Sequence, residues 1–102
     1  MGKQTDRINQ MEAHLDTLTA ANRQLISALE TFKNAQDAYV ALDEYYNGKL
    51  WRKDFDDDKN GKIPAEIKRG VLSEDGVYNA LTDYKASCFD ALEAMAMLLK
   101  KI

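Results

Sequence analysis

The sequence predicts an all-α protein: a long antiparallel helical hairpin with a short helical insert that caps one end. A length of 102 residues allows one domain with a modest core. Apolar residues recur at alternating steps of three and four in two long segments, as on one face of a helix. The single Pro and most of the five Gly lie outside those segments. We therefore expect one helical domain over residues 1–102, and we favour a dimeric bundle.

The first helix is predicted over about residues 4–47, which contain no Gly or Pro. Its apolar residues follow a heptad repeat, in which two positions, a and d, form the seam that faces another helix. The a position is held by Ile8, Leu15, Asn22, Leu29, Gln36 and Asp43. The d position is held by Met11, Leu18, Leu25, Phe32, Tyr39 and Tyr46. The stripe is widened on its flanks by Ala21, Ala28, Ala35 and Leu42 and by Ile26 and Val40. Asn47-Gly48 should end the helix, with Gly48 in the left-handed conformation.

The last helix is predicted over about residues 74–102. Ser73 is the expected N-cap, and the acidic residues Glu74 and Asp75 suit the first turn of a helix. A seam again runs to the end, through Val77, Leu81, Tyr84, Cys88, Ala91, Met95, Leu98 and Ile102. The simplest way to bury both seams is to lay the two helices antiparallel.

The two helices differ in length, at roughly 65 Å and roughly 40 Å for a rise of about 1.5 Å per residue. One hairpin therefore cannot cover the whole stripe of the first helix. Either its N-terminal third kinks back near Asn22, or a second chain covers it. We favour a homodimer, because a buried Asn at a seam position can fix register and oligomeric state by pairing with its mate. Asn22 facing solvent is the open alternative.

Residues 48–72 form a compact insert between the helices. Leu50, Trp51 and Phe55 have the spacing of a short helical face and are expected to act as a hydrophobic plug. Pro64 is expected to begin a brief helix that ends at Gly70. The apolar residues expected to anchor the insert to the bundle are Ile63, Ile67, Val71 and Leu72.

Residues 56–67 resemble part of an EF-hand calcium loop. Asp56, Asp58 and Asn60 occupy the first, third and fifth ligand positions, and the Lys62 carbonyl would be the seventh. Glu66 lies one residue before the twelfth position, where a bidentate Glu is required and Ile67 stands. With that ligand missing and with Pro64 at the ninth position, we expect a polar turn and no metal. A weak cation site made of these residues is the alternative.

Neither the composition nor the remaining reactive residues point to a catalytic or cofactor site. The formal net charge of -3, without a basic stripe, argues against nucleic acid as a partner. No segment is long and apolar enough to enter a membrane. Cys88 is the only cysteine and His14 the only histidine, so neither has a partner of its own type. We expect Cys88 in the core, no catalytic residue, no cofactor and a cytoplasmic location.

The stretch Gly61-Lys62-Ile63-Pro64, followed by Lys68-Arg69-Gly70-Val71-Leu72-Ser73-Glu74-Asp75, carries a family resemblance. With Trp51, Asp54, Tyr78, Leu81 and Asp83 around it, the chain resembles small bacterial proteins, mostly from Firmicutes, catalogued as domain of unknown function 4298. The resemblance covers nearly the whole chain. It implies a short, helix-rich cytoplasmic protein and supplies no catalytic residues. Gly76 departs from the pattern, which would have a better helix former there.

The sequence leaves two possible functions, one as an interaction protein and one as a metal-binding protein. The first is a non-enzymatic helical interaction or scaffold protein that forms a homodimer and presents a surface to an unknown protein partner. The residues of the candidate interaction patch on the insert are Trp51, Lys68 and Arg69. The alternative is a weak calcium-binding protein that uses the degenerate loop at residues 56–67.

Overall fold

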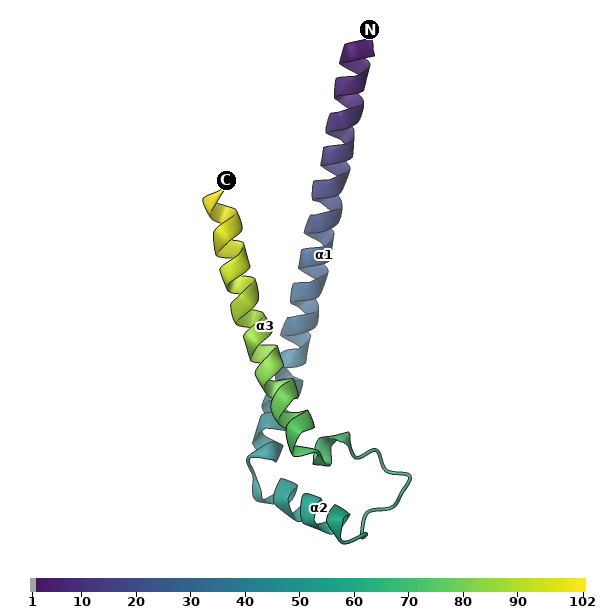
Figure 1. The fold of residues 1–102 in the computed structure, drawn as a ribbon, viewed down its shortest axis with the longest axis vertical. Helices are drawn as coiled ribbons and strands as arrows, with labels where there is room; N and C mark the ends of the chain where they lie inside the picture. Colours follow the sequence, from purple (N-terminus) through teal and green to yellow (C-terminus); the bar gives the residue numbers. More distant parts are fainter. Residues whose placement is uncertain (1) are drawn as a thin grey trace. The chain divides into compact units, whose positions relative to one another are not determined.

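The computed structural model describes residues 2–102, and these are folded into helices joined by turns (Figure 1). The elements in order are α1 (Gly2–Tyr46), α2 (Lys49–Lys59), the 3-10 helix η1 (Gly70–Leu72) and α3 (Glu74–Lys100). No strand occurs in this part of the chain. The predicted all-α class is therefore confirmed.

Contacts divide the chain into two units, Met1–Asp37 (unit 1) and Ala38–Ile102 (unit 2). Over residues 2–37, unit 1 is a single stretch of helix, the first part of α1. A lone helix has no interior, and no side chain of residues 2–37 is buried. Helix α1 is continuous through Asn22, where a kink was the alternative. Its apolar stripe in unit 1 therefore depends on another helix for burial.

Unit 2 contains an antiparallel hairpin made by the end of α1 and the start of α3. The rings of Tyr39 and Tyr84 are in contact, with centroids 5.2 Å apart. Further along α1, Leu42 lines the same hollow as Val77 and Ala80, which come earlier in α3. Residue numbers thus rise along one helix as they fall along the other. This confirms the predicted hairpin within unit 2.

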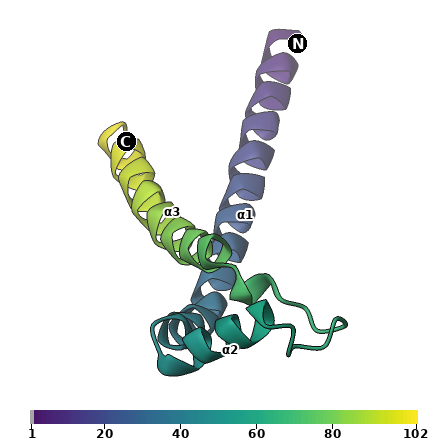
Figure 2. The same cartoon turned by 60° about the horizontal axis from the view of Figure 1, so that its bottom comes forward.

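The core of unit 2 is small and centres on Trp51. Its indole is 5 % exposed, stacks on Phe55 at 4.9 Å and meets the Tyr46 ring edge-on at 5.1 Å. The indole N–H donates a hydrogen bond to the Val71 carbonyl at 2.9 Å. The other buried residues in the described part of the chain are Leu72, Val77 and Leu81. Helix η1 contacts both α2 and α3, and Figure 2 shows it between them. The predicted hydrophobic plug is therefore Trp51 with Phe55, whereas Leu50 is exposed.

The prediction of a brief helix that begins at Pro64 is wrong. The Ile67 N–H reaches the Pro64 carbonyl at 3.1 Å, but this turn does not continue, and the next helical residues are Gly70–Leu72 of η1. Of the four apolar residues expected to anchor the insert, only Leu72 is buried. So few residues between a Pro and a Gly form a marginal helix, and nothing in unit 2 covers an apolar face there.

The sequence predicted a left-handed backbone at Gly48, and this prediction is wrong. The glycine is explained instead by the lack of space for a side chain. Gly48 is extended, with φ -100° and ψ 175°, and forms the N-cap of α2. A Cβ atom there would lie 3.0 Å from the Glu44 carbonyl oxygen, which the helix end brings close. The glycine with positive φ (72°) is Gly61, just after α2 ends.

Helix α3 begins as predicted, with Ser73 as its N-cap. The Ser73 hydroxyl accepts a hydrogen bond from the Gly76 N–H at 3.1 Å, and Glu74 and Asp75 occupy the first turn. A Cβ atom at Gly76 would lie 3.2 Å from that hydroxyl oxygen. The glycine that departs from the family pattern therefore leaves room for the cap.

Cys88 does not lie in the core. It is exposed, because α3 extends past the short part of α1 that belongs to unit 2. Within residues 2–102, no helix is both long enough and apolar enough to cross a lipid bilayer.

Candidate functional site

The acidic run of the insert lies on a helix and not in a loop. Helix α2 continues to Lys59, so Asp56 and Asp58 are in its last turns. Residues two apart on a helix point to different faces, which separates the first and third positions of the calcium pattern. The backbone N–H of Asn60 donates to the Asp56 carbonyl at 3.1 Å, continuing the helical pattern. The geometry of an EF-hand loop is therefore absent from these residues.

Two carboxylates of this run, Asp57 and Asp58, are paired with cations of the chain itself. Asp57 accepts a hydrogen bond from Lys53 at 3.0 Å and lies 4.0 Å from the Lys62 amine. Asp58 pairs with the Arg69 guanidinium at 3.3 Å. The hydrogen bond to Asp57, and then the negative charge of Asp57, raise the pKa of Lys53 above its ordinary value. Such partly exposed pairs contribute little to stability, because solvent screens the charges. The pairs made by Lys62 and Arg69 connect residues 60–69 to the end of α2.

Tyr45 and Asp54 form a short polar contact in unit 2. The tyrosine hydroxyl donates to Asp54 Oδ2 at 2.6 Å, which joins the end of α1 to α2. Burial, and then the hydrogen bond and negative charge of Asp54, raise the pKa of Tyr45 to about 12. The hydroxyl therefore stays protonated, and stays a donor, well into the alkaline range.

This contact predicts an alkaline loss of stability. Because the folded-state pKa of Tyr45 lies above its ordinary value of 10.0, its contribution is complete below pH 10 and is lost as pH rises toward 12. Tyr45→Phe has no such proton, so the melting-temperature advantage of the wild type should shrink across that interval. Thermal melts of both proteins in steps from pH 8 to pH 12 test this. An advantage that stays constant with pH would contradict the role given to the Tyr45 hydroxyl.

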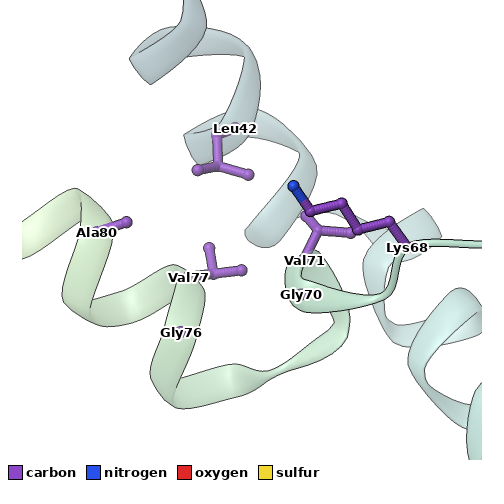
Figure 3. Close-up of a pocket in the computed structure, with 7 residues that line it drawn as sticks. All are labelled: Leu42, Lys68, Gly70, Val71, Gly76, Val77 and Ala80. Carbon is purple, nitrogen blue, oxygen red and sulfur yellow. The ribbon is translucent and has the colours of Figure 1, made fainter.

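A hollow of about 430 Å³ opens beside η1 (Figure 3). Its apolar wall is made by Leu42 of α1, Val71 of η1, and Val77 and Ala80 of α3. Lys68 is its one charged lining residue, and Figure 3 shows the Lys68 side chain running past Val71 toward Leu42. Gly70 and Gly76 complete the lining. The hollow can take an apolar group that has an acceptor near the Lys68 amine.

The predicted interaction patch is divided between three environments. Trp51 is nearly buried, and its N–H is used within unit 2. Lys68 lines the hollow, while Arg69 pairs with Asp58. Trp51 therefore acts on the surface indirectly, by holding Val71 in place.

The Tyr45–Asp54 contact and the hollow had little or no signal in the sequence. The Tyr45–Asp54 contact joins residues nine apart across a helix break, for which no sequence pattern exists. The hollow combines residues from α1, η1 and α3. Only the apolar stripes pointed to it, through Leu42 on the flank of one and Val77 on the seam of the other. His14 lies exposed in unit 1. Within residues 2–102, no three His, Cys, Asp or Glu side chains lie close enough together to hold a metal ion.

The family model described as Domain of unknown function (DUF4298) matches residues 8–94. The chain belongs to the DUF4298 family. No curated protein and no solved structure matches it significantly. The DUF4298 match begins at the seam residue Ile8 and extends into the second half of α3, so it includes residues 38–94 of unit 2 and all the residues that line the hollow. The family resemblance seen in the sequence is confirmed.

Proposed function

We propose that this DUF4298 protein is a non-enzymatic helical interaction protein that associates with itself through α1. One observation carries the proposal: the seam residues of α1 from Ile8 to Leu18 are apolar, follow the heptad repeat and are open to solvent. Their exposed fractions are 51 % for Ile8, 55 % for Met11, 57 % for Leu15 and 71 % for Leu18. A continuous exposed apolar stripe of this kind marks a surface that binds another protein.

Burial of this stripe is a sufficient driving force. Fully burying one Leu, Ile or Met side chain contributes about 1.5–3 kcal/mol, and a second copy would bring the same residues. Association costs roughly 4–15 kcal/mol in lost freedom of motion. Pairing Ile8, Met11, Leu15 and Leu18 with the same residues of a second copy would make four layers of two half-exposed side chains each. The free energy gained by burying these layers is of the size needed to offset that cost.

The scaffold role follows from what self-association would do. A dimer held by unit 1 would carry two copies of unit 2, each with its apolar hollow beside Lys68. We propose that this surface contacts a protein partner, in the cytoplasm, where Cys88 stays reduced. The carboxylates of α2 support a structural role, because Asp54, Asp57 and Asp58 are occupied by partners within the chain.

Sedimentation equilibrium of the whole chain tests the proposal. Between about 1 and about 300 µM, we expect the mass to rise from that of one chain, 11.6 kDa, to that of a dimer. A mass of 11.6 kDa that stays constant over the whole range would overturn it.

Calcium binding is the alternative function, and the helical position of Asp56 and Asp58 counts against it. We expect about 2 mM calcium to change the melting temperature by less than about 1 °C relative to the same protein with a chelator. A ligand that binds only the folded state would raise it, so thermal melts decide the question. A rise of several degrees that Asp56→Asn abolishes would favour the calcium function instead.

A further inference from the structure

We infer that two copies of α1 associate as a parallel, in-register coiled coil over about residues 4–25. The inference rests on the proposed self-association and adds the occupant of the exposed stripe, its direction and its register. Four features of the described chain carry it: the lengths of the helices, the width of the stripe, the placement of charge and an asparagine at a seam position.

The first feature is that α3 is too short to cover this part of α1. Helix α1 has 45 residues and α3 has 27. The contact between Tyr39 and Tyr84 sets the register of the hairpin in unit 2. Only 16 residues of α3 follow Tyr84, whereas 37 residues of α1 precede Tyr39. Helix α3 is therefore too short to cover the whole stripe of α1, and the seam between Ile8 and Leu18 is left for another chain.

The second feature is a change in the width of the stripe along α1. Between about residues 21 and 42 the seam is flanked by Ala21, Ala28, Ala35, Leu42, Ile26 and Val40, which suits contact with more than one helix. Before residue 20 the flanking positions are polar, with Arg7, Glu12, His14 and Thr19. A narrow a/d seam with polar flanks is the pattern of a coiled coil of two helices.

The third feature is charge, which selects the direction. In a parallel pair the residue before an a position faces, on the partner, the residue five places later. Arg7 of one copy would then face Glu12 of the other, twice per dimer. Neither residue makes an ion pair within residues 2–102. In an antiparallel pair, Arg7 would instead face positions such as His14 or Ala21, without an opposite charge.

Asn22 gives an independent indication of direction. It is exposed in α1 and occupies an a position. In a parallel pair, a positions meet their own mates, so the two Asn22 amides can hydrogen-bond to each other. In an antiparallel pair an a position packs against a d position, which would leave the amide against an apolar side chain. A buried amide without a hydrogen-bond partner there would be unfavourable.

Disulfide cross-linking tests direction and register together. In a Cys88→Ser background, Ile8→Cys places a thiol at an a position, and parallel pairing brings it next to its mate. We expect mild oxidation to convert most of the chain to a covalent dimer on a non-reducing gel. Ala13→Cys, on the opposite face of the same helix, is the matched control and should stay monomeric on the gel.

The outcomes separate this inference from the proposed function. A chain that sediments as a dimer, but whose Ile8→Cys variant cross-links no better than Ala13→Cys, overturns the parallel register and leaves self-association standing. A chain that sediments only as a monomer overturns both. Efficient cross-linking at Ile8→Cys alone supports the parallel coiled coil.

A charge exchange keeps the test decisive if a cysteine at the seam weakens association. Arg7→Glu should face Glu12 of the partner in both symmetric pairs and raise the dissociation constant about tenfold at low salt. Glu12→Arg should have a similar effect. The double variant restores opposite charges, so its dissociation constant should return to within about twofold of the wild type. If the double variant stays as weak as the single ones, these residues do not face each other.

Discussion

Replacing Trp51 with alanine is expected to lower the free energy of unfolding of unit 2 by about 4 kcal/mol, within the range for removal of a large buried aromatic side chain. The indole is 5 % exposed and fills the space between Tyr46 and Phe55. Its loss opens a cavity and also leaves the Val71 carbonyl without its donor. Because only four residues of the described chain are buried, little else can hold α2 and η1 in place.

Urea unfolding followed by circular dichroism measures this loss, since the variant lacks the only tryptophan and its fluorescence cannot be used. Trp51→Phe keeps a ring but not the N–H, and it should lose about 1–2 kcal/mol. Leu50→Ala is the matched control, because it removes an exposed apolar side chain from the same helix and should change stability by less than about 0.5 kcal/mol. Equal losses for Trp51→Ala and Leu50→Ala would show that Trp51 is not the centre of the core.

The helices could be predicted because their signals are local and repeated. The heptad pattern of α1 extends over many turns without a Gly or Pro, so a few polar residues at seam positions do not obscure it. The start of α3 was predicted from Ser73 and two acidic residues, which act on the adjacent backbone. Signals of this kind depend little on the rest of the fold.

Residues 60–72 could not be predicted, because their conformation depends on distant residues. Pro64 and Gly70 have the spacing of a short helix, yet the segment is held by Arg69 on Asp58 and by Trp51 on Val71. Gly48 shows the same limit: its extended backbone follows from the close approach of the Glu44 carbonyl. A sequence reveals that a glycine is present, but not whether it serves a turn or a close contact.

The candidate site was only partly predictable for a related reason. Asp56, Asp58 and Asn60 match a ligand pattern by spacing, but that pattern assumes a loop, and α2 continues through both aspartates. Spacing along the chain has a different meaning on a helix, where alternate residues diverge. The hollow beside Lys68 needs three separate elements, so its existence depends on the hairpin register.

The stripe on α1 and the core of unit 2 are expected to respond independently to mutation. The seam residues from Ile8 to Leu18 lie in unit 1, whereas Trp51 and its contacts lie in unit 2. Mutations that share no contacts have additive effects on stability. A change in the seam should therefore alter association and leave the unfolding of the Trp51 core unchanged.

Leu15→Glu is accordingly expected to abolish self-association while α1 stays helical. Leu15 is 57 % exposed in the single chain, so the substitution has little to disrupt there, and glutamate is a good helix former. In a dimer the two carboxylates would face each other in an apolar layer. Losing the leucine contacts and burying like charges should raise the dissociation constant by at least about 100-fold, or about 2.7 kcal/mol.

Sedimentation equilibrium at equal concentrations of wild type, Leu15→Glu and Ala13→Glu measures the effect. Ala13→Glu introduces the same charge on the opposite face of α1, so its dissociation constant should stay within about threefold of the wild type. Circular dichroism should show equal helix content in the two variants when both are monomeric. If Leu15→Glu associates as strongly as Ala13→Glu, the seam of α1 is not the surface that joins the chains, whatever their oligomeric state.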